Sequence, residues 1–147
     1  MIQTGSHDIV VTTDRSRFDL DVIHGYLARS YWAHGIPREL VARAMDHSLC
    51  FGAFEGTRQV GFARVISDRA TFAYVSDVFV VESHQGRGVG KRLMAAIMAH
   101  PELQGLRRWT LVTRDAHGLY RQYGFREPRY PERLMEVFDG DPYGAAG

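Results

Sequence analysis

Alternating glycines set among cations form the segment of the sequence best suited to chemistry. The glycines are Gly86, Gly88 and Gly90, and the cations are Arg87, Lys91 and Arg92. An apolar, β-branched run precedes the segment, and an amphipathic stretch over 89–100 follows it. A strand, a tight turn and a helix start direct backbone N–H groups and the positive helix end at one point. Small residues also let a phosphate approach, so this order predicts an anion site.

The spacing of this segment excludes two common phosphate-binding templates. A nucleotide P-loop needs Ser or Thr after its lysine, whereas Arg92 follows Lys91. A dinucleotide fingerprint needs a glycine five residues after the first, and that position is Lys91. A tight turn that only begins a helix stays open as the alternative to a ligand site.

Two motifs in this region resemble those of the GNAT N-acetyltransferase superfamily. Residues 85–90, Gln-Gly-Arg-Gly-Val-Gly, match its acyl-CoA pyrophosphate loop, Gln/Arg-x-x-Gly-x-Gly/Ala, and Val80 stands five residues before the glutamine. Residues 119–125, Leu-Tyr-Arg-Gln-Tyr-Gly-Phe, resemble its second hallmark, Leu-Tyr-x-x-x-Gly-Phe. The chain departs from the family at Thr113, where many members carry asparagine.

The resemblance implies that acetyl-CoA is a cosubstrate and that an amine accepts the acetyl group. The pyrophosphate would lie on the loop amides, and the pantetheine arm would lie along the preceding strand as an added strand does. The cofactor-binding residues expected from this resemblance are Phe79, Val80, Val81, Gln85, Gly86, Arg87, Gly88, Val89, Gly90 and Lys91.

Two residues are candidates for moving protons. Tyr120 matches the family's usual general acid, which would protonate the leaving thiolate; the alternative is a core aromatic. A lysine-like amine has a pKa of about 10.4, so freeing it at pH 7 costs about 4–5 kcal/mol. Asp77 interrupts an apolar run just before the expected thioester gap, which makes it the candidate base. The alternative is a structural ion pair with Arg64 on the adjacent strand.

The acceptor side is expected from the first helices and their connection. The candidates are Tyr31, Trp32, Phe72 and Tyr74. Trp32 could instead pack under the helix pair. The residues His34, His84 and His117 are expected at the surface, and no His/Asp/Glu spacing resembles a metal site.

These residues indicate an acetyl-CoA-dependent N-acetyltransferase acting on a primary amine of a small molecule or peptide. Direct transfer in a ternary complex is favoured over a covalent intermediate, because the single cysteine, Cys50, lies in an apolar run. The alternative is a non-catalytic acyl-CoA-binding sensor or scaffold, which would need neither Tyr120 nor a base. The family is compatible with a homodimer.

The elements that must position these residues alternate between strands and helices. The sequence predicts strands over 9–13, 49–54, 59–66, 71–81, 109–113 and 133–138, and helices over 18–31, 37–47, 89–100 and 117–123. Hairpins beside a strand–helix–strand crossover predict an α+β fold. The expected architecture is a GNAT-like three-layer fold, a mixed twisted sheet flanked by about four helices.

Composition and length limit the number of domains, the class of partner and the expected location. The 147 residues are expected to form one domain over 1–147, with 139–147 a flexible tail. A net charge of +1 without a dense basic run argues against a nucleic-acid partner. No apolar run reaches about 18 residues, and the N-terminus lacks a signal-peptide pattern. With one cysteine and thus no intrachain disulfide, the expected location is the cytoplasm, away from membranes.

Overall fold

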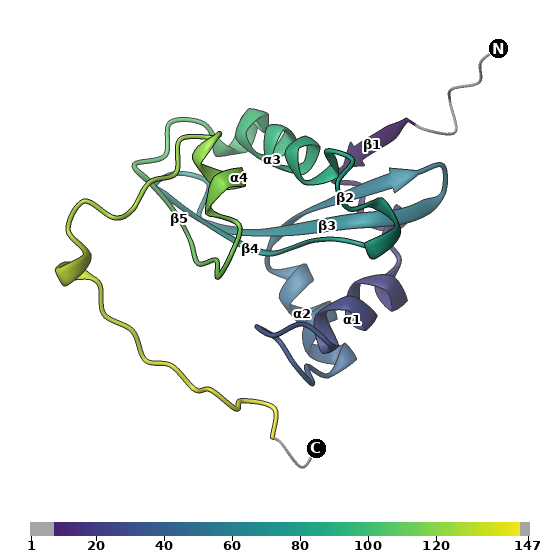
Figure 1. Ribbon diagram of the computed structural model, residues 1–147, viewed down its shortest axis with the longest axis horizontal. Helices are drawn as coiled ribbons and strands as arrows, with labels where there is room; N and C mark the ends of the chain where they lie inside the picture. Colours follow the sequence, from purple (N-terminus) through teal and green to yellow (C-terminus); the bar gives the residue numbers. More distant parts are fainter. Residues whose placement is uncertain (1–7, 145–147) are drawn as a thin grey trace.

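The computed structural model describes residues 8–144, which contain one five-stranded sheet (Figure 1). The strands are β1 (Ile9–Thr12), β2 (Leu49–Glu55), β3 (Arg58–Ser67), β4 (Phe72–Val80) and β5 (Arg108–Leu111). They lie side by side in sequence order. The first four are antiparallel neighbours, whereas β5 runs parallel to β4 after a crossover through a helix. The sheet is therefore mixed, as the sequence predicts.

Helices cover both faces of this sheet and complete three layers. The α-helices are α1 (Leu20–Ala28), α2 (Arg38–Asp46), α3 (Val89–Ala99) and α4 (His117–Arg121). Figure 1 shows α1 and α2 on one face and α3 and α4 on the other. One core, including Leu93, Met94 and Ile97, lies between α3 and the sheet, and a second, including Ile23 and Met45, lies under α1 and α2. This arrangement confirms the predicted α+β class and three-layer fold.

Local capping sets where α1 begins. The Asp19 side chain accepts hydrogen bonds from the N–H groups of Asp21 and Val22 at 3.0 and 3.2 Å. It thus satisfies two of the backbone donors that a helix start leaves unpaired. The helix therefore starts at Leu20, two residues later than the apolar pattern alone predicts.

A bulge in β4 separates this strand from β5. The β3–β4 register shifts between Phe62 and Arg64, so that two β4 residues face one residue of β3. At the bulge, Asp77 has φ +55, a left-handed conformation that Asp tolerates better than most residues. The strand β4 pairs with β5 only from Phe72 to Val75. Beyond Val75, the edge of β4 that faces β5 thus has no strand partner in the described chain, whereas the other edge stays paired with β3.

The predicted last strand, 133–138, is not formed in the chain described. One 3-10 turn, Pro131–Arg133, precedes an extended segment whose side chains are exposed. Strand structure needs backbone pairing with a partner edge, and 134–138 pairs with no strand of the described sheet, although residues 134–136 line a groove beside β5. Of the predicted tail, 145–147 lies outside the described residues, as does the N-terminal stretch 1–7.

Across residues 8–144, no helix has the length and apolar character needed to cross a membrane.

Candidate active site

The glycine-rich loop presents a row of unused backbone donors at the start of α3. Gly86 and Gly88 have φ values of +77 and +80, and Gly88 is the N-cap of α3. Within the described chain, none of the N–H groups from Gly86 to Lys91 donates to another residue. A Cβ built on either positive-φ glycine would meet nothing within 4 Å. The loop is therefore exposed, uncrowded and supplied with unused donors, which fits a diphosphate.

Cations surround these donors. The side chains of Arg87, Lys91 and Arg92 are exposed, and none makes an ion pair with another residue of the part described. Uncommitted positive charge beside a helix N-terminus attracts an anion. The acidic residue nearest in sequence, Glu82, is already engaged by Arg29 at 2.7 Å.

The last two loop residues also serve the packing of the fold. Val89 is buried in the core between α3 and the sheet. A Cβ on Gly90 would lie 3.5 Å from Leu119 Cδ2, an ordinary contact with α4. The Lys91 carbonyl accepts a hydrogen bond from the Tyr123 hydroxyl at 2.9 Å. The two sequence motifs are therefore in direct contact, through the start of α3 and the end of α4.

Two side chains, exposed Gln85 and buried His84, fix the loop to the sheet. The Gln85 side-chain amide donates to the Val80 carbonyl at 2.9 Å, which closes the turn after β4. His84 is 3% exposed, so its prediction as a surface residue was wrong. Its Nδ1 lies 2.8 Å from Ser83 Oγ, and its Nε2 lies 3.0 Å from Glu55 Oε1 on β2. Sequence spacing could not reveal this contact, because the partner lies 29 residues away.

The end of β4 offers backbone rather than side chains. Phe79 is buried, and its ring stacks on that of Tyr26 with centroids 4.1 Å apart. Val80 pairs with Gly61 of β3, and the Val81 N–H donates to the Val60 carbonyl. The other edge of β4 faces the gap left by β5. An extended amide-bearing ligand could therefore align along Phe79–Val81.

Tyr120 lies on α4 with its ring packed and its hydroxyl unengaged. The side chain is 8% exposed, and its ring meets that of Phe125 at 6.1 Å. No other described residue forms a hydrogen bond with its hydroxyl. Burial raises the pKa of Tyr120 to about 12, and Tyr31 and Asp115 add to the shift. The phenol is therefore protonated at neutral pH, and its O–H group is available to donate to a ligand.

Asp77 joins two elements at the bulge. Its Oδ2 accepts from Arg64 Nε at 2.8 Å, and its Oδ1 accepts from Trp32 Nε1 at 2.9 Å. The Arg64 and Asp77 side chains are 17% and 11% exposed. Arg64 also donates to Ser48 Oγ at 3.1 Å. The ion pair considered from the sequence is thus present, and Trp32 is a partner that spacing could not show.

The two aromatics of the α1–α2 connection reach the bulge of β4 and the loop that follows β5. The Tyr31 ring carries the Arg114 guanidinium at 3.8 Å, and its hydroxyl accepts from the Arg114 N–H at 3.3 Å. The Tyr31 and Trp32 rings meet edge to face at 5.1 Å. These contacts join one helical layer to the loop before α4. Trp32 is 41% exposed, so it does not pack under the helix pair.

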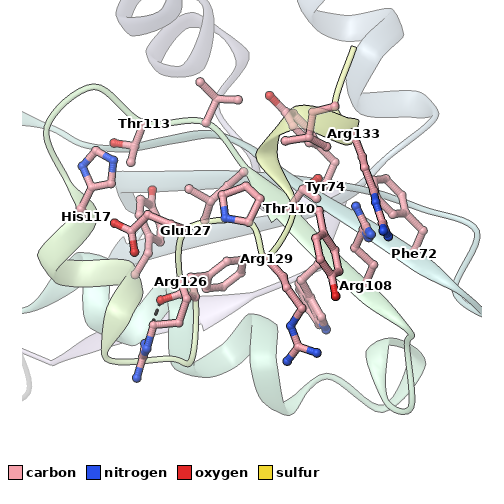
Figure 2. Close-up of a pocket in the computed structure, with 18 of the residues that line it drawn as sticks. Phe72, Tyr74, Arg108, Thr110, Thr113, His117, Arg126, Glu127, Arg129 and Arg133 are labelled. Atoms are coloured by element: carbon pink, nitrogen blue, oxygen red, sulfur yellow. Dashed lines mark hydrogen bonds between the residues drawn. The ribbon is translucent and has the colours of Figure 1, made fainter. Parts of the chain in front are cut away.

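The other two predicted acceptor residues line a separate groove of about 970 Å³ beside β5 (Figure 2). Phe72 and Tyr74 lie on its β4 side, together with Thr113 and Tyr120 from the loop and helix that follow β5. Burial raises the pKa of Tyr74, and the charge of Asp77 adds to the effect. The predicted acceptor residues thus occupy two neighbouring places. At Thr113 the chain departs from the family pattern. Its hydroxyl accepts a hydrogen bond from the Ala116 N–H at 3.0 Å and so supports the start of α4.

Among residues 8–144, no group of three His, Cys, Asp or Glu side chains is arranged to hold a metal ion.

Comparisons with known proteins identify the family of this chain. A family model for the GNAT acetyltransferase domain matches residues 46–127. A Gibberella zeae protein assigned as an acetyltransferase is 30% identical over 83% of this chain and 81% of its own length. Serotonin N-acetyltransferase 2, chloroplastic, from rice is 33% identical over 76% of this chain and 59% of its own length.

Solved structures show the same fold. A Xanthomonas campestris protein assigned to the GNAT family superposes with a TM-score of 0.90 and 57% identity, over 92% of this chain and 96% of that one. A Clostridium acetobutylicum protein solved with acetyl-CoA has a TM-score of 0.63 at 14% identity, over 89% and 95% of the two chains. The fold and these relatives define an acyltransferase. The chain belongs to the GNAT family of acetyltransferases, which use acetyl-CoA.

Proposed function

We propose that this enzyme transfers the acetyl group of acetyl-CoA to a primary amine of a small molecule or peptide, within one ternary complex. The observation that carries the proposal is the run of unused N–H groups over 86–91, beneath open space and beside unpaired cations. Bound acetyl-CoA would supply an acetyl thioester, whose C–S bond breaks as the amine nitrogen forms the new amide bond.

The residues over 79–91 divide the work of holding this cosubstrate. The N–H groups of Gly86 to Lys91 would bind the diphosphate, and the side chains of Arg87 and Lys91 would neutralise it. The free edge of Phe79, Val80 and Val81 would take the pantetheine amides as an added strand does. Gln85 keeps the loop closed on Val80, and Val89 anchors it to the core.

An amine acceptor is supported by the relatives and by the aromatic side chains at the gap. The rice relative is named as an N-acetyltransferase for serotonin, which is itself a primary amine. In this chain, Tyr31 and Trp32 stand on one side of the acceptor path, and Phe72 and Tyr74 line the groove beside it. Aromatic faces bind cationic or aromatic amines. We therefore assign these four residues to acceptor binding.

Two side chains are assigned to proton transfer. Asp77 accepts one hydrogen bond on each oxygen, which leaves lone pairs for a proton from the attacking amine. Tyr120 would donate its phenolic proton to the departing thiolate, since its hydroxyl is otherwise unengaged. Direct transfer is favoured, because the only cysteine of the chain, Cys50, is buried in β2 and its pKa is raised to about 11 by burial.

The test is an acceptor panel in which free thiol release from acetyl-CoA is measured and hydrolysis without acceptor is subtracted. We expect turnover with at least one class of primary amine. The double variant Arg87→Gln with Lys91→Gln should raise the KM for acetyl-CoA about tenfold, which corresponds to about 1.4 kcal/mol of lost binding. The control Arg43→Gln removes an exposed charge on α2 and should leave KM unchanged. An equal KM in both variants would contradict the loop assignment.

A further inference from the structure

Four side chains in contact form a strip that begins at the bulge of β4. This charged strip consists of Asp77, Trp32, Tyr31 and Arg114. Trp32 Nε1 donates to Asp77 Oδ1 at 2.9 Å, and the Trp32 and Tyr31 rings meet at 5.1 Å. The Arg114 guanidinium carbon then lies 3.8 Å from the centre of the Tyr31 ring. The strip therefore runs from a carboxylate, across two aromatic rings, to a cation.

The two ends of the charged strip differ in depth. The Asp77 side chain is 11% exposed, whereas that of Arg114 is 64% exposed. Both aromatic side chains between them are exposed. A molecule that lies along the strip would therefore have one end held within the protein and the other close to solvent.

The outer end of the strip has hydrogen-bond donors that this chain leaves unused. A guanidinium stacked on an aromatic ring uses its face and keeps its N–H groups for other partners. Among residues 8–144, the Arg114 side chain donates no hydrogen bond, and its ion-pair partner, Asp115, lies at 3.8 Å with both side chains exposed. Such an exposed pair is weak. Arg64, by contrast, is engaged by Asp77 and Ser48, so Arg114 is the cation available to an anion.

The charged strip lies beside both residues that we assign to proton transfer. Asp77, the proposed base, is its inner end. Tyr31 contributes to the raised pKa of Tyr120, the proposed acid, so the two phenols share one electrostatic environment. The Tyr31 hydroxyl also accepts from the Arg114 N–H at 3.3 Å, which holds Arg114 in the same region. An acceptor with its amine at Asp77 would therefore extend over the aromatic rings toward Arg114.

We propose that the acceptor is a primary amine with a remote carboxylate, whose amine reaches Asp77 and whose carboxylate binds the Arg114 guanidinium. This inference rests on the proposed function, in which Asp77 takes a proton from the attacking amine. An ω-amino acid or a short peptide has these two groups at opposite ends. In an α-amino acid they are adjacent, so they cannot reach both ends of a strip that contains two rings.

Each part of such an acceptor matches a part of the charged strip. The guanidinium fork binds a carboxylate through two parallel N–H···O bonds, and the chain between the two groups packs on the aromatic rings. The carboxylate takes no part in the transfer. The amine nitrogen bonds to the acetyl carbon and the C–S bond breaks, while one amine proton passes to Asp77 and the thiolate takes a proton from Tyr120.

The first test compares ε-aminocaproate with its neutral amide in the assay of free thiol release. The two acceptors share the amine and the chain and differ in the charge at the far end. We expect kcat/KM to be about tenfold higher for the acid, and Arg114→Gln to bring the ratio of the two values close to one. Arg114→Lys keeps the charge without the fork and should retain part of the ratio.

The matched control for this ratio is Arg107→Gln. It removes another exposed arginine, which lies just before β5 and forms no ion pair within residues 8–144. The preference for the acid should persist in this variant. A ratio close to one in the wild type, or a ratio that Arg114→Gln leaves unchanged, would overturn the proposal.

The second test varies the separation between the amine and the carboxylate. Glycine and glycinamide differ in the same way as the first pair, but their two groups are adjacent. Arg114→Gln should therefore change kcat/KM for glycine and for glycinamide by the same factor. A selective loss for glycine as large as that for ε-aminocaproate would mean that Arg114 attracts anions without the strip, which refutes the proposal.

The third test is calorimetric and needs no turnover. Each member of the first pair is titrated into protein saturated with coenzyme A. We expect a lower Kd for the acid than for the amide in the wild type, and equal Kd values in Arg114→Gln. Turnover of both compounds without tighter binding of the acid would support acetyl transfer and refute the role of Arg114. Tighter binding of the acid without turnover of any amine would support the strip and refute the proposed transfer.

Discussion

At the scale of single residues, the proposed chemistry depends on a phenol held in its protonated form. Tyr120 is buried, its hydroxyl has no partner in the described chain, and its pKa is raised to about 12. A phenol that stays protonated across the working pH range keeps a proton available for transfer. This suits the acid of a transfer in which the leaving thiolate takes up a proton.

The rate effect of Tyr120→Phe follows from this geometry. The change removes one hydroxyl and little volume, so the ring contact with Phe125 should persist. Loss of a general acid typically lowers the rate by about 10²–10⁴-fold. We expect kcat to fall at least tenfold while the KM for acetyl-CoA stays within about twofold. Unchanged kcat, with chemistry shown to limit turnover, would return Tyr120 to a packing role.

The same raised pKa predicts a loss of stability in alkali. Below pH of about 10 the phenol is neutral in both the folded and the unfolded chain, so it has no effect there. Between about pH 10 and 12 the unfolded chain ionises Tyr120 while the folded chain does not, so the free energy of unfolding falls. Urea titrations should show a shallower fall for Tyr120→Phe. Cys50→Ala is the comparison. Burial raises the pKa of Cys50 to about 11, so its own contribution to the alkaline loss of stability falls about one pH unit below that of Tyr120. Equal slopes for wild type and Tyr120→Phe would contradict the burial effect.

The role of Asp77 is tested by a variant that can keep its left-handed backbone conformation. Asparagine tolerates the φ of +55, so Asp77→Asn adds no strain that alanine would bring. If the carboxylate takes the amine's proton, turnover at pH 7 should fall at least tenfold, and the deficit should shrink toward pH 10 as the amine deprotonates unaided. Loss of the charge beside Arg64 should also lower the free energy of unfolding by about 1–3 kcal/mol.

A pH–rate profile and melting curves on the same Asp77→Asn protein separate these effects. Ser48→Ala serves as a control, since it removes the other hydrogen-bond acceptor of Arg64 but no charge. A stability loss with a pH-independent rate deficit would leave Asp77 as a structural partner of Arg64.

At the scale of elements, the glycine-rich loop is positioned by the turn before it, which is fixed to the sheet. Glu82–His84 forms a 3-10 turn, and the buried His84 ring ties it to Ser83 and to Glu55 on β2. The glycines of the loop have no side chains of their own to fix its position. The anchor for the amides that we propose to bind the diphosphate is therefore a histidine outside the motif.

His84→Ala should remove that anchor. It leaves a void in the turn and removes one partner of Glu55, which should lower the free energy of unfolding by about 1–3 kcal/mol. We expect the KM for acetyl-CoA to rise several-fold, since the amides lose their alignment. His117→Ala, an exposed histidine on α4, is the matched control. Calorimetric binding of coenzyme A that is equal in the two variants would show that the loop holds its shape without His84.

Elements whose signals are local were predictable from the sequence. The β4–loop–α3 unit and the second motif on α4 rest on neighbouring residues, and the structure has them within a few residues of the expected bounds. The bulge at Asp77 gives no such signal, because an aspartate in an apolar run fits a regular strand equally well. The strand expected over 133–138 failed for another reason: its pattern is present, but its backbone pairs with no edge of the described sheet.

At the scale of the whole molecule, contacts remote in sequence connect the α1–α2 layer to the sheet and to the loop after β5. Tyr31 bonds to Arg114 across 83 residues, and Trp32 bonds to Asp77 across 45. The sequence identified both aromatics as candidates but could not pair them, since one-dimensional spacing carries no information on such contacts. These pairings join the α1–α2 layer to the region where β4 and β5 part.

Ligand binding should therefore stabilise the whole protein. A ligand that binds only the folded state adds RT ln(1 + [L]/Kd), about 2.7 kcal/mol at a hundredfold excess over Kd. For a chain of this size, about 1 kcal/mol shifts Tm by about 2–4 °C, so saturating coenzyme A should raise Tm by about 5–10 °C. Thermal scans over a ligand series measure this shift and yield Kd.

Two variants locate the origin of that thermal shift. Gly90→Ala adds a Cβ that meets Leu119 at an ordinary contact distance on the α4 side, and alanine favours the helix by about 0.5–1 kcal/mol. Its apo Tm should rise and its ligand-induced shift should persist, because its N–H still faces the loop. Arg87→Gln with Lys91→Gln should keep the apo Tm, as both side chains are exposed, yet lose most of the shift. The reverse pattern would mean that coenzyme A binds away from the start of α3.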